Sequence, residues 1–131
     1  MKIEVTLLEG QQLKASFADH EIISDQSISA GGNAEHPEPF DYFLSSMPMC
    51  AAFYMRKFCQ QRDIETTGLS ITQDVITLDE SNPYKKKVSM KVTLPTDFPK
   101  KYQKAILAAA NTCTVKKVIQ ATPEFEVELV K

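Results

Sequence analysis

The sequence has few of the signals that mark exported proteins. It contains 131 residues and three cysteines, Cys50, Cys59 and Cys113, which form no Cys-x-x-Cys pair. The amino-terminal segment alternates charged and apolar side chains, whereas a signal peptide needs a continuous apolar run. Few cysteines and no export signal favour a reducing compartment over a disulfide-stabilised scaffold. We therefore expect a cytoplasmic protein.

The chain also lacks a large excess of charge and a long apolar segment. Its net charge of −2 and pI near 5.7 give no overall basic character that would attract nucleic acid. Local lysine clusters at residues 85–87, 100–104 and 116–117 indicate solvated faces. The most apolar stretch, residues 41–55, is shorter than the ~20 residues that cross a bilayer and contains Pro48. We expect neither a nucleic acid nor a membrane as partner.

Motifs for phosphate and metal ions are missing as well. The Gly31-Gly32 pair is part of neither a Gly-Lys-Ser/Thr nor a Gly-x-Gly-x-x-Gly pattern, so it indicates a tight turn. A metal site would have to recruit His20 or His36, and no His-x-x-x-His spacing supports one. We expect no bound metal and no resident cofactor.

The apolar content of 43% is sufficient for the core of one domain that spans residues 1–131. The patterns predict strands at residues 3–8, 13–18, 21–25, 69–78, 86–94 and 125–130, a helix from Pro39 onward, and helices at 98–112 and 114–120. In the fifth strand, alternation predicts that Val88, Met90, Val92 and Leu94 face inward. The order β-β-β-α-β-β-α-α-β indicates the α+β class.

The helix that begins at Pro39 carries the strongest apolar signal. Pro39 suits a first helical turn, and Asp41 is well placed for the positive end of the helix. No charged residue occurs between Asp41 and Arg56, and apolar side chains occupy nearly every face. Such a helix belongs at the centre of a molecule or across a subunit interface. Pro48 removes a backbone hydrogen bond and should kink it.

The three cysteines differ in their local settings. Cys59 follows Cys50 by nine positions, which on a helix places it on the opposite side and about 13 Å away, too far for a disulfide. Cys113 lies at the start of a short helix, where unpaired N–H groups and the nearby Lys116 and Lys117 should lower its pKa. The apolar surroundings of Cys50 should raise its pKa. The residues alone leave open structural cysteines, a redox pair of Cys50 and Cys113, or a metal site.

Several segments, in their order and spacing, resemble the OsmC/Ohr family, small cytosolic proteins of bacterial stress and peroxide metabolism. These segments are Glu21-Ile-Ile-Ser-Asp25, Gly31-Gly32, Pro39-Phe-Asp-Tyr-Phe-Leu-Ser-Ser-Met-Pro-Met-Cys50 and Cys113-Thr-Val-Lys-Lys-Val-Ile119. The family has a glycine-rich loop, a helix with its first cysteine at this spacing, and a late Cys-Pro-Val-x-Lys motif. The resemblance runs along nearly the whole chain.

The resemblance implies an intertwined homodimer in which antiparallel sheets wrap two central helices, with active sites at the subunit interface. It implies that Cys50 is a peroxidatic thiolate that reduces organic hydroperoxides and becomes a sulfenic acid. Cys113 would resolve it as a disulfide, and an external dithiol of the lipoyl type would restore both thiols.

The resemblance also implies further site residues. The peroxidase branch activates its first cysteine with an early-strand arginine paired to a glutamate just after the helix-start proline. Here Lys14 is the early-strand cation of that region and Asp41 is the carboxylate, while Thr114 replaces the usual proline. Because arginine and lysine are not equivalent donors, the chain is similar to an OsmC-like branch other than the Ohr peroxidases proper.

Two other functions remain open on the same fold. One is a non-enzymatic protein that binds a small apolar ligand, and the other is a thiol-disulfide accessory protein that exchanges disulfides with partner proteins. We expect the substrate-binding or ligand-binding residues to be Phe40, Phe43, Met47 and Met49.

Overall fold

The computed structural model describes residues 1–130 and confirms the α+β class. The chain divides into two compact units, Met1–Ser45 and Ser46–Lys131, which we describe separately. Helix α1 (Pro39–Gln60) begins in the first unit and ends in the second. It starts at the proline that the sequence indicates.

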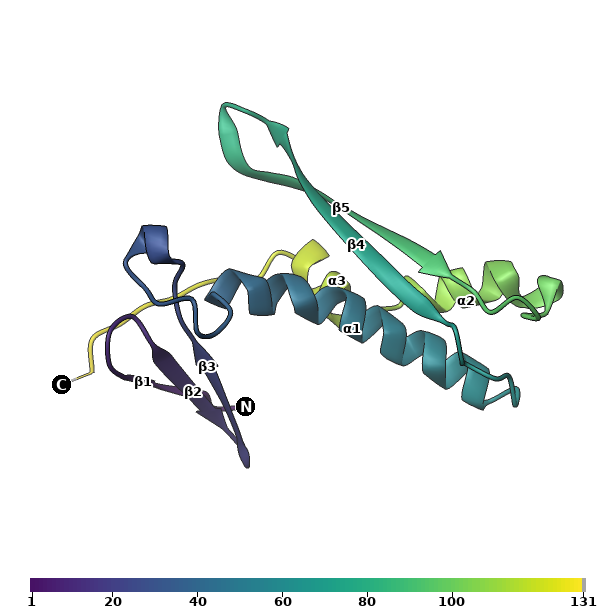
Figure 1. The fold of residues 1–131 in the computed structure, drawn as a ribbon, viewed down its shortest axis with the longest axis horizontal. Coiled ribbons are helices and arrows are strands. Elements are labelled where there is room, and N and C mark those ends of the chain that lie inside the picture. Colours follow the sequence, from purple (N-terminus) through teal and green to yellow (C-terminus); the bar gives the residue numbers. More distant parts are fainter. Residues whose placement is uncertain (131) are drawn as a thin grey trace. The chain divides into compact units, whose positions relative to one another are not determined.

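The first unit is built on a three-stranded antiparallel meander (Figure 1). Its strands are β1 (Glu4–Leu7), β2 (Leu13–Phe17) and β3 (His20–Ser24), in the order β1-β2-β3, which confirms the three predicted strands within two residues. One apolar patch of the sheet meets the first turns of α1, where the Tyr42 hydroxyl donates to the Ile23 carbonyl at 2.6 Å. This bond ties the start of the helix to β3.

Asp25, which the sequence patterns did not single out, organises the loop between β3 and α1. Its side chain is 1% exposed, and its carboxylate accepts hydrogen bonds from the Gln26 N–H at 2.8 Å and the Glu35 N–H at 3.1 Å. A Cβ atom on Gly32 would lie 2.2 Å from the Gln26 carbonyl oxygen, so this position needs glycine. The glycine pair therefore serves a tightly folded turn, with η1 (Ile28–Ala30) just before it.

The second unit combines a β-hairpin with the part of α1 from Ser46 onward and three further helical segments. The elements after α1 are β4 (Ser70–Asp79), β5 (Asn82–Thr93), η2 (Lys100–Tyr102), α2 (Gln103–Ala110) and α3 (Thr114–Gln120). The core contains Met55, Phe58, Cys59, Phe98 and Ile106. Leu94 and Val92 pack against this core, and Val88, Met90 and Val92 face a cavity shared with the helices, as the alternation predicts.

The predicted helix 98–112 is shorter in the structure. Its first turn, at Lys100–Tyr102, is a 3-10 helix, and α2 ends at Ala110. Phe98 precedes the helix and is buried in the core with 6% of its surface exposed. Pro99 follows Phe98 and restricts it to an extended conformation, which explains the later start.

Helix α1 is helical on both sides of Pro48 and is buried along one face. Met47, Ala51 and Met55 repeat at every fourth position and are at most 5% exposed. On another face, Met49 is 70% exposed and Phe53 is 59% exposed. The expected burial on nearly all sides is therefore not found within a single chain, because the elements of the described residues cover only part of the helix.

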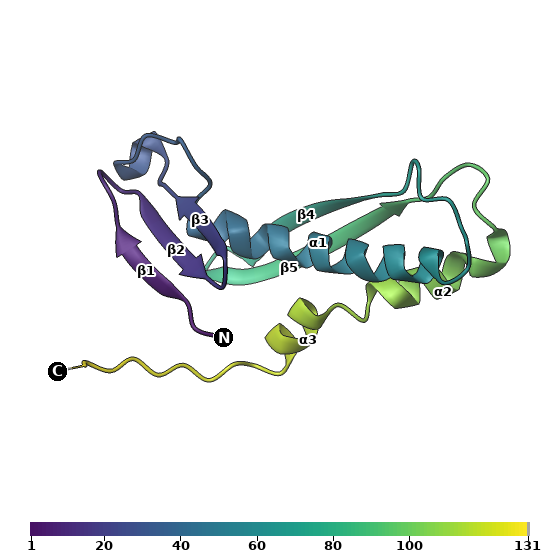
Figure 2. The same cartoon turned by 90° about the horizontal axis from the view of Figure 1, so that it is seen from below.

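The predicted strand at residues 125–130 is absent. Residues 125–130 form neither helix nor strand, and Figure 2 shows an extended chain after α3. Apolar side chains alternate here with glutamates, and Phe125, Val127 and Leu129 are 86–98% exposed. A strand exists by hydrogen bonding to a neighbouring strand, and none among residues 1–130 pairs with this segment.

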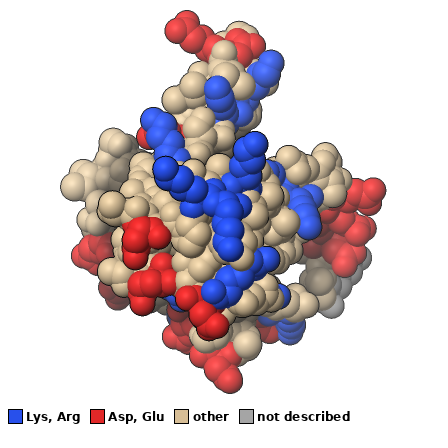
Figure 3. All heavy atoms as spheres, turned by 90° about the vertical axis from the view of Figure 1, so that its right-hand side faces the viewer, with Lys and Arg blue, Asp and Glu red and all other residues tan. Residues whose placement is uncertain are grey.

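The lysines of the local clusters lie at the surface. Figure 3 shows lysine and arginine side chains on one face with aspartate and glutamate side chains beside them. This mixture of signs is that of an ordinary solvated surface. No helix within residues 1–130 combines the length and the apolar character needed to span a membrane.

We expect Asp25→Asn to destabilise the protein at neutral pH. The backbone N–H of Gln26 has the largest effect on the pKa of Asp25 and lowers it. Burial opposes this effect, and the N–H groups of Glu35 and Asn33 lower the pKa further. The ionised Asp25 carboxylate therefore stabilises the folded protein fully at pH values above the carboxyl pKa of the unfolded chain, about 3.9. This stabilisation is lost as the pH falls through the lower pKa of the folded state.

Thermal unfolding at pH 7 and near pH 3 tests this. The Tm of the variant should lie several degrees below that of the natural chain at pH 7, and the gap should narrow at low pH. Asp19→Asn, in the exposed turn between β2 and β3, is the matched control. An equal difference in Tm between Asp25→Asn and the natural chain at both pH values would contradict the role given to the Asp25 carboxylate.

Candidate functional site

Cys50 and Cys113 meet in the second unit, where the start of α3 lies against the middle of α1. Cys113 is the N-cap of α3, and its sulfur accepts a hydrogen bond from the Lys116 N–H at 3.4 Å. The Cys113 thiol donates to the Met47 carbonyl at 3.8 Å, and it lies near enough to Cys50 to lower the pKa of that thiol. The fold thus brings together two thiols that lie 63 positions apart in the sequence.

The pKa of Cys50 is lowered, contrary to the expectation from its apolar helix. Partial burial opposes ionisation, but three donors outweigh it: the Val115 N–H, the Cys113 thiol and the Thr114 N–H. Hydrogen bonds to the charged form of a group favour that form. The start of α3 therefore supplies the polar partners that the sequence of α1 does not contain.

The pKa of Cys113 is raised, so the sequence-based expectation for this residue is wrong. Burial is the main cause, since the side chain is 1% exposed. The Lys116 N–H favours the thiolate of Cys113, but the interaction with Cys50 raises the pKa further. With Cys50 as thiolate, Cys113 stays protonated and donates a hydrogen bond. The N–H groups of the helix start thus favour both thiolates, but at Cys113 burial and the neighbouring Cys50 outweigh them.

A side-chain hydrogen bond fixes the same contact between α1 and α3. The hydroxyl groups of Tyr54 and Thr114 lie 2.7 Å apart. Tyr54 follows Cys50 by one helical turn and so lies on the same side of α1. The sequence analysis missed Tyr54, because no local pattern distinguishes it from the other aromatic residues of the helix.

Cys59 is remote from this chemistry. Its side chain is fully buried in the apolar core, and burial raises its pKa against a smaller opposing effect of Arg62. A buried thiol of this kind is unreactive. The structure therefore gives Cys59 a place in the apolar core.

Lys14 and Asp41, the other predicted catalytic residues, lie in the first unit. Lys14, on β2, pairs with Glu21 of β3 at 3.5 Å. The Asp41 carboxylate accepts a hydrogen bond from the Glu38 N–H at 2.9 Å, which is the return bond of a capping box at the start of α1. These contacts give both residues structural roles, and their catalytic roles stay predictions.

The four predicted substrate-binding residues have different surroundings. Phe40 and Phe43 stack with ring centroids 5.8 Å apart, and each exposes about half of its surface. Met49 is 70% exposed, whereas Met47 is buried. Met47 lines a cavity of about 470 Å³ in the second unit, together with Val88, Met90, Val92, Leu107, Ala110, Asn111, Cys113, Lys116, Ile119 and Gln120.

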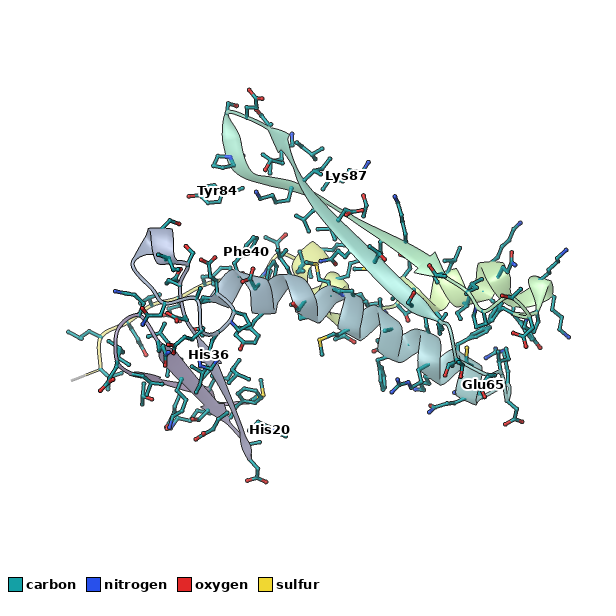
Figure 4. All side chains as sticks on the ribbon, viewed as in Figure 1. His20, His36, Phe40, Glu65, Tyr84 and Lys87 are labelled. Carbon is teal, nitrogen blue, oxygen red and sulfur yellow. The ribbon has the colours of Figure 1, made fainter. Side chains whose placement is uncertain are left out.

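No metal centre is formed by the described part of the chain. Among residues 1–130, no three His, Cys, Asp or Glu side chains gather as a possible set of ligands. His20 begins β3, and its ring is tilted against that of Phe17 with the centroids 5.9 Å apart, whereas His36 lies in the loop before α1 (Figure 4). The thiols of this site are those of Cys50, on α1, and Cys113, at the start of α3.

Comparisons with known proteins place these features in a family. The model of the OsmC-like protein family matches residues 31–128, a range that contains Cys50, Cys113 and the whole of the second unit's helices. The chain belongs to the OsmC-like protein family. No curated protein gives a significant match to the sequence.

Solved structures share the OsmC-like fold of this chain. One is a putative osmotic stress induced and detoxification response protein from Psychrobacter arcticus 273-4, 24% identical, with a TM-score of 0.68 over 89% of this chain and 86% of that one. Another is an organic hydroperoxide resistance protein OsmC, described as a predicted redox protein, from Legionella pneumophila. It is 15% identical, with a TM-score of 0.58 over 92% of this chain and 90% of that one.

We expect Cys50 to react with iodoacetamide at lower pH than Cys113, because its pKa is lowered and that of Cys113 is raised. The reduced protein is alkylated briefly at a series of pH values from 6 to 10, and its peptides are analysed by mass spectrometry. This gives the pH at which alkylation of each cysteine is half-maximal, its midpoint. Cys59 should stay unmodified until the protein unfolds. A lower midpoint for Cys113 than for Cys50 would contradict the site as described.

Proposed function

We propose that this OsmC-like protein is a thiol-dependent peroxidase that reduces organic hydroperoxides with Cys50 and Cys113. The observation that carries the proposal is the pair of neighbouring thiols, in which the half-buried Cys50 has a lowered pKa and the buried Cys113 has a raised pKa. A peroxidatic cysteine must be a thiolate, and a resolving cysteine must lie within reach of it.

In the first step, the Cys50 thiolate attacks one oxygen of the hydroperoxide. A sulfur–oxygen bond forms, the oxygen–oxygen bond breaks, and the leaving alkoxide takes a proton from water to become an alcohol. Cys50 is oxidised by two electrons to a sulfenic acid. The N–H groups of Thr114 and Val115 favour the thiolate before the attack.

In the second step, the Cys113 sulfur attacks the sulfur of the sulfenic acid. A sulfur–sulfur bond forms, the sulfur–oxygen bond breaks, and hydroxide leaves and takes up the thiol proton as water. Because the Cys113 thiol gives up its proton in this step, it no longer donates to the Met47 carbonyl. An external dithiol of the lipoyl type then supplies two electrons and two protons, which restores both thiols.

The relatives support this chemistry in part. The name of the Legionella protein includes organic hydroperoxide resistance, and that of the Psychrobacter protein includes detoxification response. Both proteins share the fold with this chain. The thiol pair is the feature of this chain that makes the same activity chemically reasonable here.

We expect Cys50→Ser to abolish consumption of cumene hydroperoxide in the presence of a dithiol, because serine cannot form the sulfenic acid. Cys113→Ser should permit one oxidation of Cys50, detected by a dimedone adduct, and should reduce multiple turnover at least tenfold. Cys59→Ala is the matched control and should keep the activity.

The proposal fails if no dithiol supports turnover and peroxide produces no Cys50–Cys113 disulfide. Two other functions would then apply. The cavity next to Cys113, with its mostly apolar lining, favours an apolar ligand, and a small molecule retained equally by the natural chain and by Cys50→Ser would support that function. A mixed disulfide with another protein, trapped in Cys113→Ser, would support a thiol-disulfide accessory role.

We also propose that the protein is a homodimer. Large apolar side chains are exposed on α1, on the sheet of the first unit and in the segment 125–130 (Phe53, Met49, Leu7, Val5, Phe125, Val127 and Leu129). Monomeric proteins seldom expose this much apolar surface. Because most soluble oligomers are homo-oligomers, we infer that a second copy of this chain covers it. Residues 125–130 would form a strand against a sheet edge of that copy.

We expect Val127→Lys to weaken the dimer, because Val127 is 98% exposed in the single chain and would be covered in the dimer. Light scattering coupled to gel filtration should give a mass of twice 14.7 kDa for the natural chain and a lower average mass for the variant. The neighbouring Glu126→Lys, on the other face of the segment, is the control. A natural chain of 14.7 kDa in solution would contradict the proposal.

A further inference from the structure

The start of α3 is attached to α1 on both sides of Cys50. On the amino-terminal side, the Cys113 thiol approaches the Met47 carbonyl at 3.8 Å. On the carboxyl-terminal side, the Tyr54 hydroxyl lies 2.7 Å from the Thr114 hydroxyl. Met47 and Tyr54 stand three positions before and four positions after Cys50, so both are on the side of α1 that carries the thiol.

We propose that Tyr54 is a positioning residue of the Cys50 site, which holds the first turn of α3 over the Cys50 sulfur through its hydrogen bond to Thr114. The inference rests on the proposed function for its role in turnover, but its structural part concerns the reduced protein alone. Tyr54 acts through Thr114 and its neighbour Val115, whose N–H groups lower the pKa of Cys50.

The two attachments differ in how long they persist during the proposed reaction. The Cys113 thiol loses its proton at the resolving step, so its hydrogen bond to the Met47 carbonyl is lost there. The bond between Tyr54 and Thr114 uses neither sulfur and need not break. An O–H···O bond of 2.7 Å is also shorter and stronger than a thiol contact of 3.8 Å.

The nearby cation is already held elsewhere. The Lys116 ammonium donates to the Asn111 side chain at 2.7 Å, and its backbone N–H bonds the Cys113 sulfur. The groups that face Cys50 from α3 are therefore N–H groups and the Cys113 thiol. Such donors act over short distances and in narrow angular ranges, so the position of the first turn decides how strongly they favour the thiolate.

The test measures the pH midpoint of Cys50 alkylation in the reduced, full-length protein, read from the Cys50 peptide by mass spectrometry. We expect Tyr54→Phe to raise this midpoint by about half a pH unit or more, which makes alkylation about threefold slower at low pH. Thr114→Val, which keeps the shape and the N–H but removes the hydroxyl, should give the same shift. The double variant should add little, because both changes remove one bond.

Two matched variants separate positioning from a general loss of stability. Thr114→Ser keeps a hydroxyl at this position and should retain the natural midpoint. Tyr42→Phe removes a hydroxyl of the same type from the same helix, where it bonds the Ile23 carbonyl, and should also retain it. Thermal unfolding shows whether each variant is folded. If Tyr54→Phe does not fold, the test uses Thr114→Val, because Thr114 is exposed.

The proposal is overturned if Tyr54→Phe and Thr114→Val leave the midpoint unchanged, if Thr114→Ser shifts it as much as Thr114→Val, or if Tyr42→Phe shifts it equally. Because alkylation needs no peroxide, the two proposals fail separately. A shifted midpoint in a protein without peroxide turnover supports the role of Tyr54 and refutes the peroxidase. Peroxide turnover together with an unshifted midpoint supports the peroxidase and refutes the role of Tyr54.

Discussion

The contact between the start of α3 and the middle of α1 is the interaction on which the site depends. Cys113 is the N-cap of α3, so the same short segment fixes the second thiol and the N–H groups of the two residues that follow it. A thiolate in a partly buried position needs such donors, because burial alone disfavours the charge. One contact between helices therefore both joins the two thiols and makes them unequal.

This inequality reverses what the local sequence indicates. A cysteine at a helix start is expected to be the more acidic thiol, and Cys113 has that position. Its burial and its neighbour Cys50 nevertheless raise its pKa, while the N–H groups of Thr114 and Val115 favour Cys50. The sequence predicted correctly that N–H groups of the helix start favour the Cys113 thiolate, but it does not show that burial and Cys50 outweigh them or that the same helix start also favours Cys50.

A second constraint is the small core of the single chain. Apolar residues make up 43% of the sequence, yet α1 buries only one face among the described residues, and much of the sheet of the first unit is exposed. The segment 125–130 has the alternation of a strand and no strand beside it. The strand prediction was wrong for the single chain because alternation describes the side chains, whereas a strand also needs an edge with which to pair.

Local patterns by themselves determined most of the elements. The alternation of β5, the proline at the start of α1 and the bounds of α3 are properties of neighbouring residues, and periodicity reports them directly. The tertiary structure alone decided the buried carboxylate of Asp25, the ionisation of Cys50 and the partner of Tyr54. The physical reason is sequence distance: Tyr54 and Thr114 are 60 positions apart, and Met47 and Cys113 are 66. Hydrogen bonds over such distances follow from packing, which no local pattern of residues contains.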